Sequence, residues 1–182
     1  MHAKVKEANR TGWATVMVTL IAMTVLLVPT TQAAEEETGQ WHALGVFVVV
    51  DKKAVTLDDR ANHIVGVYEL DGAVFNSGGK PFLDKARYQV VAINDIGVTR
   101  GGYKTFTDAD GSKVFARYTI TEGKPSESRG TFEFTGGTGK YKGIIGKGTF
   151  HNVFVSDKAA WDELVGEYRI PTPAAGAGPA GK

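Results

Sequence analysis

Four tyrosines each stand directly beside a charged residue, and this pairing predicts where their rings point. The pairs are Tyr68 with Glu69, Tyr88 with Arg87, Tyr118 with Arg117, and Tyr168 with Arg169. Neighbouring side chains of a β-strand point to opposite faces, so charges in solvent would place all four rings inside. Rings that carry hydroxyls can desolvate an apolar molecule and orient it by hydrogen bonds. The pattern therefore favours a pocket for a small apolar ligand.

Phenylalanine and asparagine extend this expected lining. In residues 130–135, alternation directs Phe132 and Phe134 inward and Glu133 outward, and Phe150, Asn152 and Phe154 follow the same rule. The predicted ligand-binding residues of the interior are Tyr68, Tyr88, Tyr118, Phe134, Asn152 and Tyr168. The same rings also fit an ordinary packed core, because a small barrel can be filled by its own side chains or hold one ligand.

Two other functions fit the same pattern. An isomerase or cyclase acting on an apolar substrate would need an inward cluster of charged or strongly polar groups, and the alternation identifies none. Glu133, Arg117 and His151 would serve as acid–base residues only if the faces were inverted, and charged strand residues are usually solvated. A structural or interaction protein with a filled core is the third hypothesis. No catalytic residue is assigned, and non-enzymatic binding is favoured.

Motifs of known chemistry are incomplete in this sequence. The run from Gly136 to Lys140 lacks the first glycine and the final hydroxyl of a phosphate-binding loop. A calcium loop around Asp108 and Asp110 would need an acid where Phe106 stands. The four histidines lack the spacing of metal ligands, and no serine has a nucleophile-elbow context. The absence of cysteine excludes thiol catalysis and thiolate metal sites. We expect no metal and no cofactor.

The glycine-rich run is instead expected to be a structural turn, built by Gly136, Gly137, Gly139 and Gly143. With its flanks, residues 130–154 (GTFEFTGGTGKYKGIIGKGTFHNVF) resemble the glycine-rich hairpin of the allene oxide cyclase and dirigent-like barrel proteins. In both, a strand, a GGTG or GSG turn, an aromatic residue (here Tyr141) and a second glycine-rich strand follow in order. The resemblance implies an eight-stranded antiparallel barrel, often oligomeric, whose plant members hold hydrophobic oxylipins or phenoxy radicals. It carries over no catalytic or substrate-binding residue.

Eight candidate strands must position these side chains. They are rich in Val, Ile, Phe, Tyr and Thr, and glycine and aspartate turn signals separate them. The candidates are residues 41–50, 63–70, 87–94, 98–106, 113–121, 130–135, 146–155 and 164–170. Turns are expected at Asp71-Gly72, at residues 76–79 and above all at Asp110-Gly111, which suits a tight hairpin. Sequential strands should therefore be antiparallel neighbours.

One short helix is expected over residues 157–164, with Ser156 as its N-cap and Trp161 and Leu164 on one side. It is too short to cover a sheet. Strands without helical cover must close on themselves or form two packed sheets, because an open sheet leaves long unpaired edges. The expected fold is an all-β, eight-stranded antiparallel closed barrel, with a β-sandwich as the alternative.

Residues 44–50 (LGVFVVV) are apolar on both faces of their strand. One face must belong to the core, and the other needs a different partner. With Phe47 and Val49 placed outward, this second face should pack against the short helix or against another subunit. A homo-oligomer is therefore an expectation.

Residues 1–33 have the pattern of a cleavable secretory signal. Lys4, Lys6 and Arg10 precede an apolar run over residues 13–28, and small residues at the end of this segment suit cleavage after Ala33. The apolar run is shorter than the roughly 20 residues that cross a bilayer. We expect a secreted or periplasmic protein that retains no membrane span after cleavage between Ala33 and Ala34.

The mature chain then divides into a flexible lead-in (residues 34–40), a barrel domain (41–170) and a disordered Pro/Ala/Gly tail (171–182). Cleavage removes three of 21 basic and one of 20 acidic residues, which leaves 18 against 19. A nearly neutral chain lacks the clustered basic face that nucleic-acid binding requires. Nucleic acid is not an expected partner.

Overall fold

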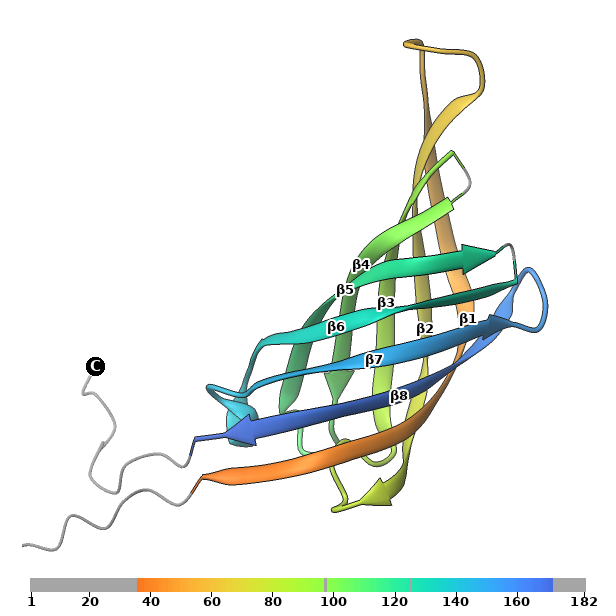
Figure 1. Cartoon of the computed structure of the whole chain (residues 1–182). Helices are drawn as coiled ribbons and strands as arrows, with labels where there is room; N and C mark the ends of the chain where they lie inside the picture. The colour runs from red at the N-terminus through yellow and green to blue at the C-terminus, as the bar shows by residue number, and fades with distance from the viewer. Residues whose placement is uncertain (1–35, 97, 125, 172–182) are drawn as a thin grey trace, which may run out of the picture. The chain divides into compact units, whose positions relative to one another are not determined.

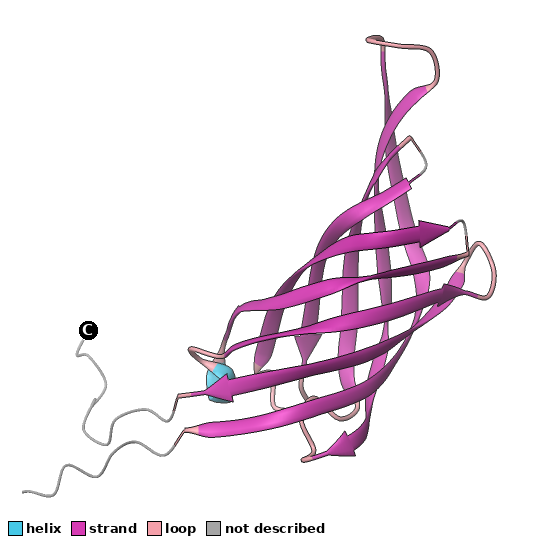
Figure 2. Ribbon diagram, in the orientation of Figure 1, coloured by secondary structure: helices cyan, strands magenta, loops and turns pink. Residues whose placement is uncertain are grey.

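The computed structural model describes residues 36–96, 98–124 and 126–171, which contain eight strands (Figures 1 and 2). The strands are β1 (Glu37–Leu57), β2 (His63–Gly79), β3 (Ala86–Asp95), β4 (Val98–Thr107), β5 (Lys113–Lys124), β6 (Glu127–Gly137), β7 (Ile145–Phe154) and β8 (Ala159–Ile170). Each pairs antiparallel with the next, and β8 pairs with β1, which closes the barrel. The predicted barrel is confirmed, and the sandwich is wrong. The predicted signal and residues 172–182 of the tail lie outside the described residues.

The helix predicted over residues 157–164 is wrong, because this segment is a turn followed by the start of β8. The hydroxyl of Ser156 accepts hydrogen bonds from the backbone N–H groups of Lys158 and Ala159 at 3.2 and 3.1 Å. Serine does this in turns as well as at helix starts, so the N-cap signal was ambiguous. Pairing of β8 with both β1 and β7 decides the conformation.

Two other boundaries differ from the prediction. β1 begins at Glu37, so residues 37–40, expected to be part of a flexible lead-in, are a strand paired with the end of β8. Asp71-Gly72 lies inside β2 instead of forming a turn, and the chain turns only after residues 76–79. β1 has no β8 partner beyond Val48 but stays paired with β2 as far as the turn at residues 58–62. The two strands therefore extend beyond the barrel wall at that turn as a two-stranded arm (Figure 1). The Asp110-Gly111 turn is confirmed, with Gly111 at φ +82°.

One half of the barrel is filled by aromatic rings, and we call it the closed half. Trp41 is 1% exposed and meets Phe82 and Phe106 edge-to-face, with ring centroids 5.4 Å apart in both pairs. Phe82 and Leu83 come from the β2–β3 loop and are buried in the core. Tyr141, on the short 3₁₀ helix η1 (Gly139–Tyr141) of the β6–β7 loop, joins them. These loops plug one end of the barrel with apolar side chains.

The predicted glycine turn surrounds this 3₁₀ helix. Gly136 and Gly137 end β6, Gly139 begins η1, and Gly143 follows it. Gly139 and Gly143 have φ values of +59° and +81°, in the left-handed region that glycine adopts most easily. The run thus forms the connection between β6 and β7 around η1.

The outward face of residues 44–50 is the reverse of the one predicted. Phe47 is 6% exposed and belongs to the core, whereas Leu44, Val46, Val48 and Val50 are between 39% and 57% exposed. Gly45 and Phe47 share the inner face with Trp41, because β1 pairs with β8 from Glu37 to Val48 without a register shift. The expected helix does not exist. Within residues 36–96, 98–124 and 126–171, no other segment covers this apolar stripe.

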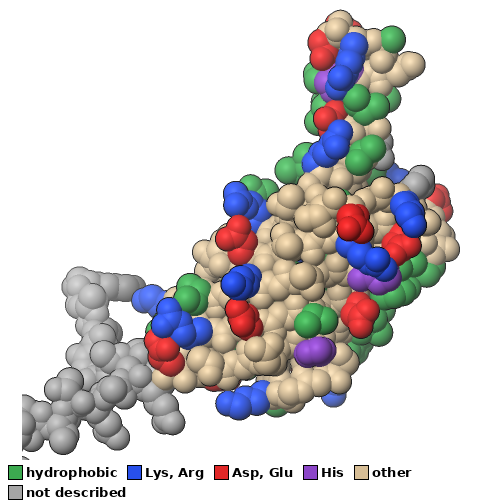
Figure 3. Space-filling model, in the orientation of Figure 1, with side chains coloured by type: hydrophobic (Ala, Val, Ile, Leu, Met, Phe, Trp, Pro, Cys, Tyr) green, Lys and Arg blue, Asp and Glu red, His purple; other side chains and the backbone are tan. Residues whose placement is uncertain are grey.

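The outer faces of β5 to β8 differ from this stripe. Arg117 pairs with Glu133 at 3.2 Å, and Lys147 pairs with Glu167 at 3.8 Å. Opposite charges are scattered over the face seen in Figure 3. The barrel wall therefore presents an apolar stripe on β1 and ion pairs on β5 to β8.

Candidate functional site

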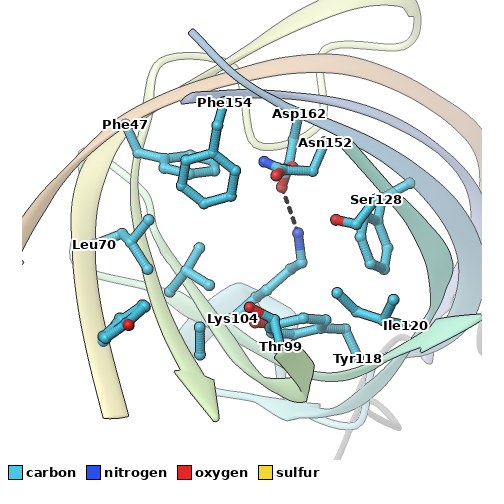
Figure 4. Close-up of a pocket in the computed structure, with 14 residues that line it drawn as sticks. Phe47, Leu70, Thr99, Lys104, Tyr118, Ile120, Ser128, Asn152, Phe154 and Asp162 are labelled. Carbon is cyan, nitrogen blue, oxygen red and sulfur yellow. Dashed lines mark hydrogen bonds and ion pairs between the residues drawn. The ribbon is translucent and has the colours of Figure 1, made fainter. Parts of the chain in front are cut away.

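A pocket occupies the half of the barrel opposite the plug, and we call it the open half (Figure 4). Its volume is about 40 Å³. This is space for a few water molecules or for the head of a larger ligand. We call the end of the pocket formed by Tyr68, Thr99, Ile120, Ser128 and Phe154 its mouth, and the last four of these residues lie close to the β3–β4, β5–β6 and β7–β8 turns. The pocket is lined by Phe47, Tyr68, Leu70, Val90, Ala92, Thr99, Lys104, Tyr118, Ile120, Ser128, Phe150, Asn152, Phe154 and Asp162.

An ion pair crosses the floor of this pocket. Lys104 Nζ donates a hydrogen bond to Asp162 Oδ2 at 2.5 Å, and both side chains are 2% exposed. Lys104 points inward because it alternates with the exposed Tyr103 and shares its face with Phe106 on β4. Asp162 points inward with Leu164 on β8 by the same rule. Strand alternation alone therefore sets both directions.

Further polar groups complete the site. The hydroxyl of Tyr88 donates to Asp162 Oδ2 at 2.5 Å, and Lys104 Nζ also hydrogen-bonds this hydroxyl. Asn152 Nδ2 donates to the other oxygen of the Asp162 carboxylate at 2.8 Å. Both carboxylate oxygens thus have partners, which a buried charge requires.

The rings around the ammonium stabilise its charge. Lys104 Nζ lies 4.6 Å from the ring centroid of Phe150 and 5.1 Å from that of Tyr118. A cation at such distances is attracted by the negative face of a ring. The ammonium is thus held by one carboxylate and by aromatic faces.

Burial changes the acidity of these groups. It lowers the pKa of Lys104 by disfavouring the ammonium, while the Asp162 carboxylate acts in the opposite direction. Burial, followed by the charge of Asp162, raises the pKa of the Tyr88 and Tyr118 hydroxyls well above the ordinary range. An amine whose proton is easier to remove therefore lies within hydrogen-bond distance of the Asp162 carboxylate.

The structure brings only some of the predicted ligand residues to the pocket. Tyr68, Tyr118 and Asn152 line it, and Tyr88 lies at its floor against Asp162. Phe134 and Tyr168 point inward as predicted, but they lie in the closed half. There Tyr168 stacks on Phe82 with centroids 4.0 Å apart, and Phe134 packs against Trp41 and Phe82.

The expectation of an interior without charged groups is wrong, because it missed Lys104 and Asp162. Lys104 could have been found by its parity with Phe106 in the predicted strand 98–106. Asp162 could not, since the residue pattern of its segment predicts a helix. The three residues that an inverted wall would have made catalytic are not inside. Arg117 and Glu133 pair with each other on the outer surface, and His151 contacts Glu127 at 2.8 Å.

The described residues contain neither a metal-binding cluster nor a candidate membrane helix. Within 36–96, 98–124 and 126–171, no group of three or more His, Cys, Asp or Glu side chains is arranged to hold a metal ion. The same residues include no helix with the length and apolar character of a membrane span.

The fold and site define a closed antiparallel barrel with a polar cluster at the floor of an apolar pocket. No protein-family model and no curated protein matches this sequence. Similar solved structures include the pterocarpan synthase dirigent proteins GePTS1 and PsPTS1. GePTS1 has a TM-score of 0.45 and 15% identity over 78% of this chain and 90% of its own. PsPTS1 has a TM-score of 0.39 and 14% identity over 74% of this chain and 96% of its own. The eight-stranded antiparallel barrel that the resemblance of residues 130–154 implied is confirmed by the strand pairing.

Proposed function

We propose that the barrel binds a small, largely apolar molecule with one polar head group. The head would lie at Lys104 and Asp162, and the apolar body would lie along the mouth against Tyr68, Ile120 and Phe154. The predicted signal in residues 1–33 makes this a proposal for a protein that acts after export.

The buried ion pair is the observation that carries this proposal. Removing two charges from water costs several kcal/mol for each ion, and apolar residues of similar volume often stabilise a protein as well or better. Lys104 and Asp162 are therefore poor choices for stability alone. Their place at the floor of a pocket with apolar walls gives them a different use, which is to recognise a polar group inside an apolar cavity.

Native mass spectrometry tests this function first. The protein, purified gently from the compartment to which it is exported, should carry a reproducible excess mass that disappears on denaturation. A variant that fills the pocket, Ala92→Leu, should lose this mass, because Ala92 lines the cavity. Ala54→Leu adds the same side chain on the exposed arm and should keep it. Equal ligand loading of both variants would refute binding in the open half.

An isomerase or cyclase is a second candidate, favoured by the inward polar cluster that this hypothesis required. Asp162 could accept a proton from a bound substrate while Tyr88 or Lys104 donates one. Asp162→Asn, purified from the same compartment, should bind the substrate without turnover, and the wild type should convert the ligand recovered from this variant. A ligand that returns unchanged after long incubation with the wild type would exclude this second function.

A further inference from the structure

We propose that Lys104 forms a covalent imine with an aldehyde or ketone that enters the open half, so that the polar head of the ligand is a carbonyl group. This inference rests on the proposed function, because it names the chemical class of the molecule bound in the same pocket.

The charges already present at the floor of the pocket argue for a neutral head group. Asp162 already balances the charge of Lys104, with 2.5 Å between Nζ and Oδ2. A carboxylate or phosphate head would bring a second negative charge into a buried site that has one cation, and this is costly. A second ammonium would compete with Lys104 for a carboxylate whose two oxygens have three donors already. A carbonyl adds no charge.

The amine of Lys104 is the group at the floor of the pocket that can react with a carbonyl. Lysine becomes a nucleophile toward carbonyl carbon when an apolar environment favours its neutral form. Lys104 has this environment, since its side chain is only 2% exposed and the pocket wall around it includes Val90 and Ala92. Asp162 lies within hydrogen-bond distance to take and return protons.

The reaction balances without another reagent. The Lys104 ammonium gives one proton to Asp162, and the neutral Nζ forms a bond to the carbonyl carbon while the C=O π pair moves to oxygen. Asp162 returns the proton to that oxygen. The resulting carbinolamine loses its oxygen as water, which takes up a second proton from Nζ by way of Asp162. The net change converts an ammonium and a carbonyl into a protonated imine and water.

The product suits the site as well as the reactant does. A protonated imine keeps one positive charge beside the Asp162 carboxylate, so the buried pair stays neutral overall. The cavity of about 40 Å³ has room for the carbonyl carbon and its nearest atoms. The remainder of the molecule would extend between the apolar side chains of the mouth.

Reductive trapping tests the inference on the wild-type protein. The folded protein is incubated briefly at neutral pH with trans-cinnamaldehyde and sodium cyanoborohydride, which reduces an imine to a stable amine. Intact mass should show one adduct per chain, and peptide mapping should place it on Lys104. Adducts spread over exposed lysines, with Lys104 unmodified, would overturn the proposal.

Variants separate chemistry from fold. Lys104→Arg keeps a cation beside Asp162 but cannot form an imine, so the single adduct should disappear. Asp162→Asn should slow trapping by about a hundredfold if the carboxylate transfers the protons. Lys147→Met removes a lysine whose side chain is 78% exposed and should leave the mapped adduct unchanged. An adduct that persists in Lys104→Arg would refute the assignment.

Cinnamyl alcohol distinguishes this inference from the function on which it rests. The alcohol has the same apolar body but no carbonyl, and its binding can be followed by native mass spectrometry. If the wild type binds the alcohol and Lys104 is not trapped by the aldehyde, the imine is wrong and the binding function stands. If neither molecule occupies the open half, both proposals fail for this ligand shape and the imine is rejected.

Discussion

Lys104 and Asp162 lie 58 residues apart in the chain and meet at 2.5 Å in the interior of the barrel. They come from β4 and β8, which are not neighbours in the sheet, so the pair spans the lumen. The pair separates the filled aromatic half from the open half. Tyr88, which bonds Asp162, stacks on Phe106 of the closed half with centroids 4.8 Å apart. The polar site therefore packs directly against the aromatic core of the closed half.

Breaking the buried pair should destabilise the protein strongly. Asp162→Ala leaves the Lys104 ammonium buried without its carboxylate, which costs about 3–5 kcal/mol of unfolding free energy. The exposed pair of Arg117 and Glu133 offers a matched control, because Glu133→Ala should cost at most about 1 kcal/mol. Urea unfolding of both variants measures the difference. Equal losses would show that the floor of the pocket is solvated.

The buried tyrosines should make the protein sensitive to alkali. Burial and the charge of Asp162 raise the pKa of Tyr118 in the folded state. The stability that depends on this protonated hydroxyl is therefore fully present below the unfolded pKa of about 10. It is lost as the pH rises from there toward the higher folded pKa, by about 1.4 kcal/mol per pH unit for each such tyrosine.

Urea unfolding between pH 8 and 11 checks this sign. Tyr118→Phe should reduce the slope of the loss above pH 10 by the contribution of one tyrosine. Tyr103→Phe changes a residue that is 55% exposed and should leave the slope as it is. A protein whose stability rises between pH 10 and 11 would contradict the prediction.

Gly45 should not tolerate a side chain, because it faces the ring of Tyr88. A Cβ atom at this position would lie 2.7 Å from Tyr88 Cε1. The ring must then move away from Asp162, and we expect Gly45→Ala to cost about 1–3 kcal/mol. Gly78→Ala is the control, since its Cβ would meet His42 Cβ at an ordinary 3.6 Å. Thermal unfolding of the two variants should differ, and identical melting curves would show that the ring adapts freely.

The exposed apolar stripe of β1 predicts self-association. Leu44 of this stripe pairs with Phe75 of β2, which is 43% exposed, so the surface continues onto the next strand. We propose that a second copy of the chain covers it, because no charged group within the stripe would oppose a like surface. Sedimentation velocity should show a dimer or larger assembly that the double substitution Val46→Lys, Val48→Lys converts to a monomer. Thr149→Lys on the outer face of β7 should leave the assembly intact, and a monomeric wild type would reject the proposal.

Alternation along the strands was readable from the sequence because it depends only on local geometry. Each strand places successive side chains on opposite faces wherever it lies in the sheet. The inward directions of Tyr88, Tyr118, Phe132 and Tyr168 followed from this rule, and all are buried. The rule failed at residues 44–50, since a strand that is apolar on both faces does not identify its inner side.

The pocket could be predicted only in part. The sequence determined that aromatic and hydroxyl-bearing side chains line the interior, but not which of them border a cavity. The plug by Phe82 and Leu83 fills one half, and loop residues give no periodic signal of where they pack. This is why Phe134 and Tyr168 lie in the core while Tyr68 and Tyr118 line the pocket.

The sequence by itself determined the strand order of a small all-β chain, the glycine turn after β6 and the faces of most side chains. These features depend on backbone preferences and on neighbours within a few residues. The tertiary structure decided that residues 159–170 form a strand, because pairing with β1 and β7 satisfies backbone groups that a short helix would satisfy locally. Closure of the barrel then brought Asp162 opposite Lys104. A contact across the lumen depends on the register of every intervening strand, and no local pattern contains that information.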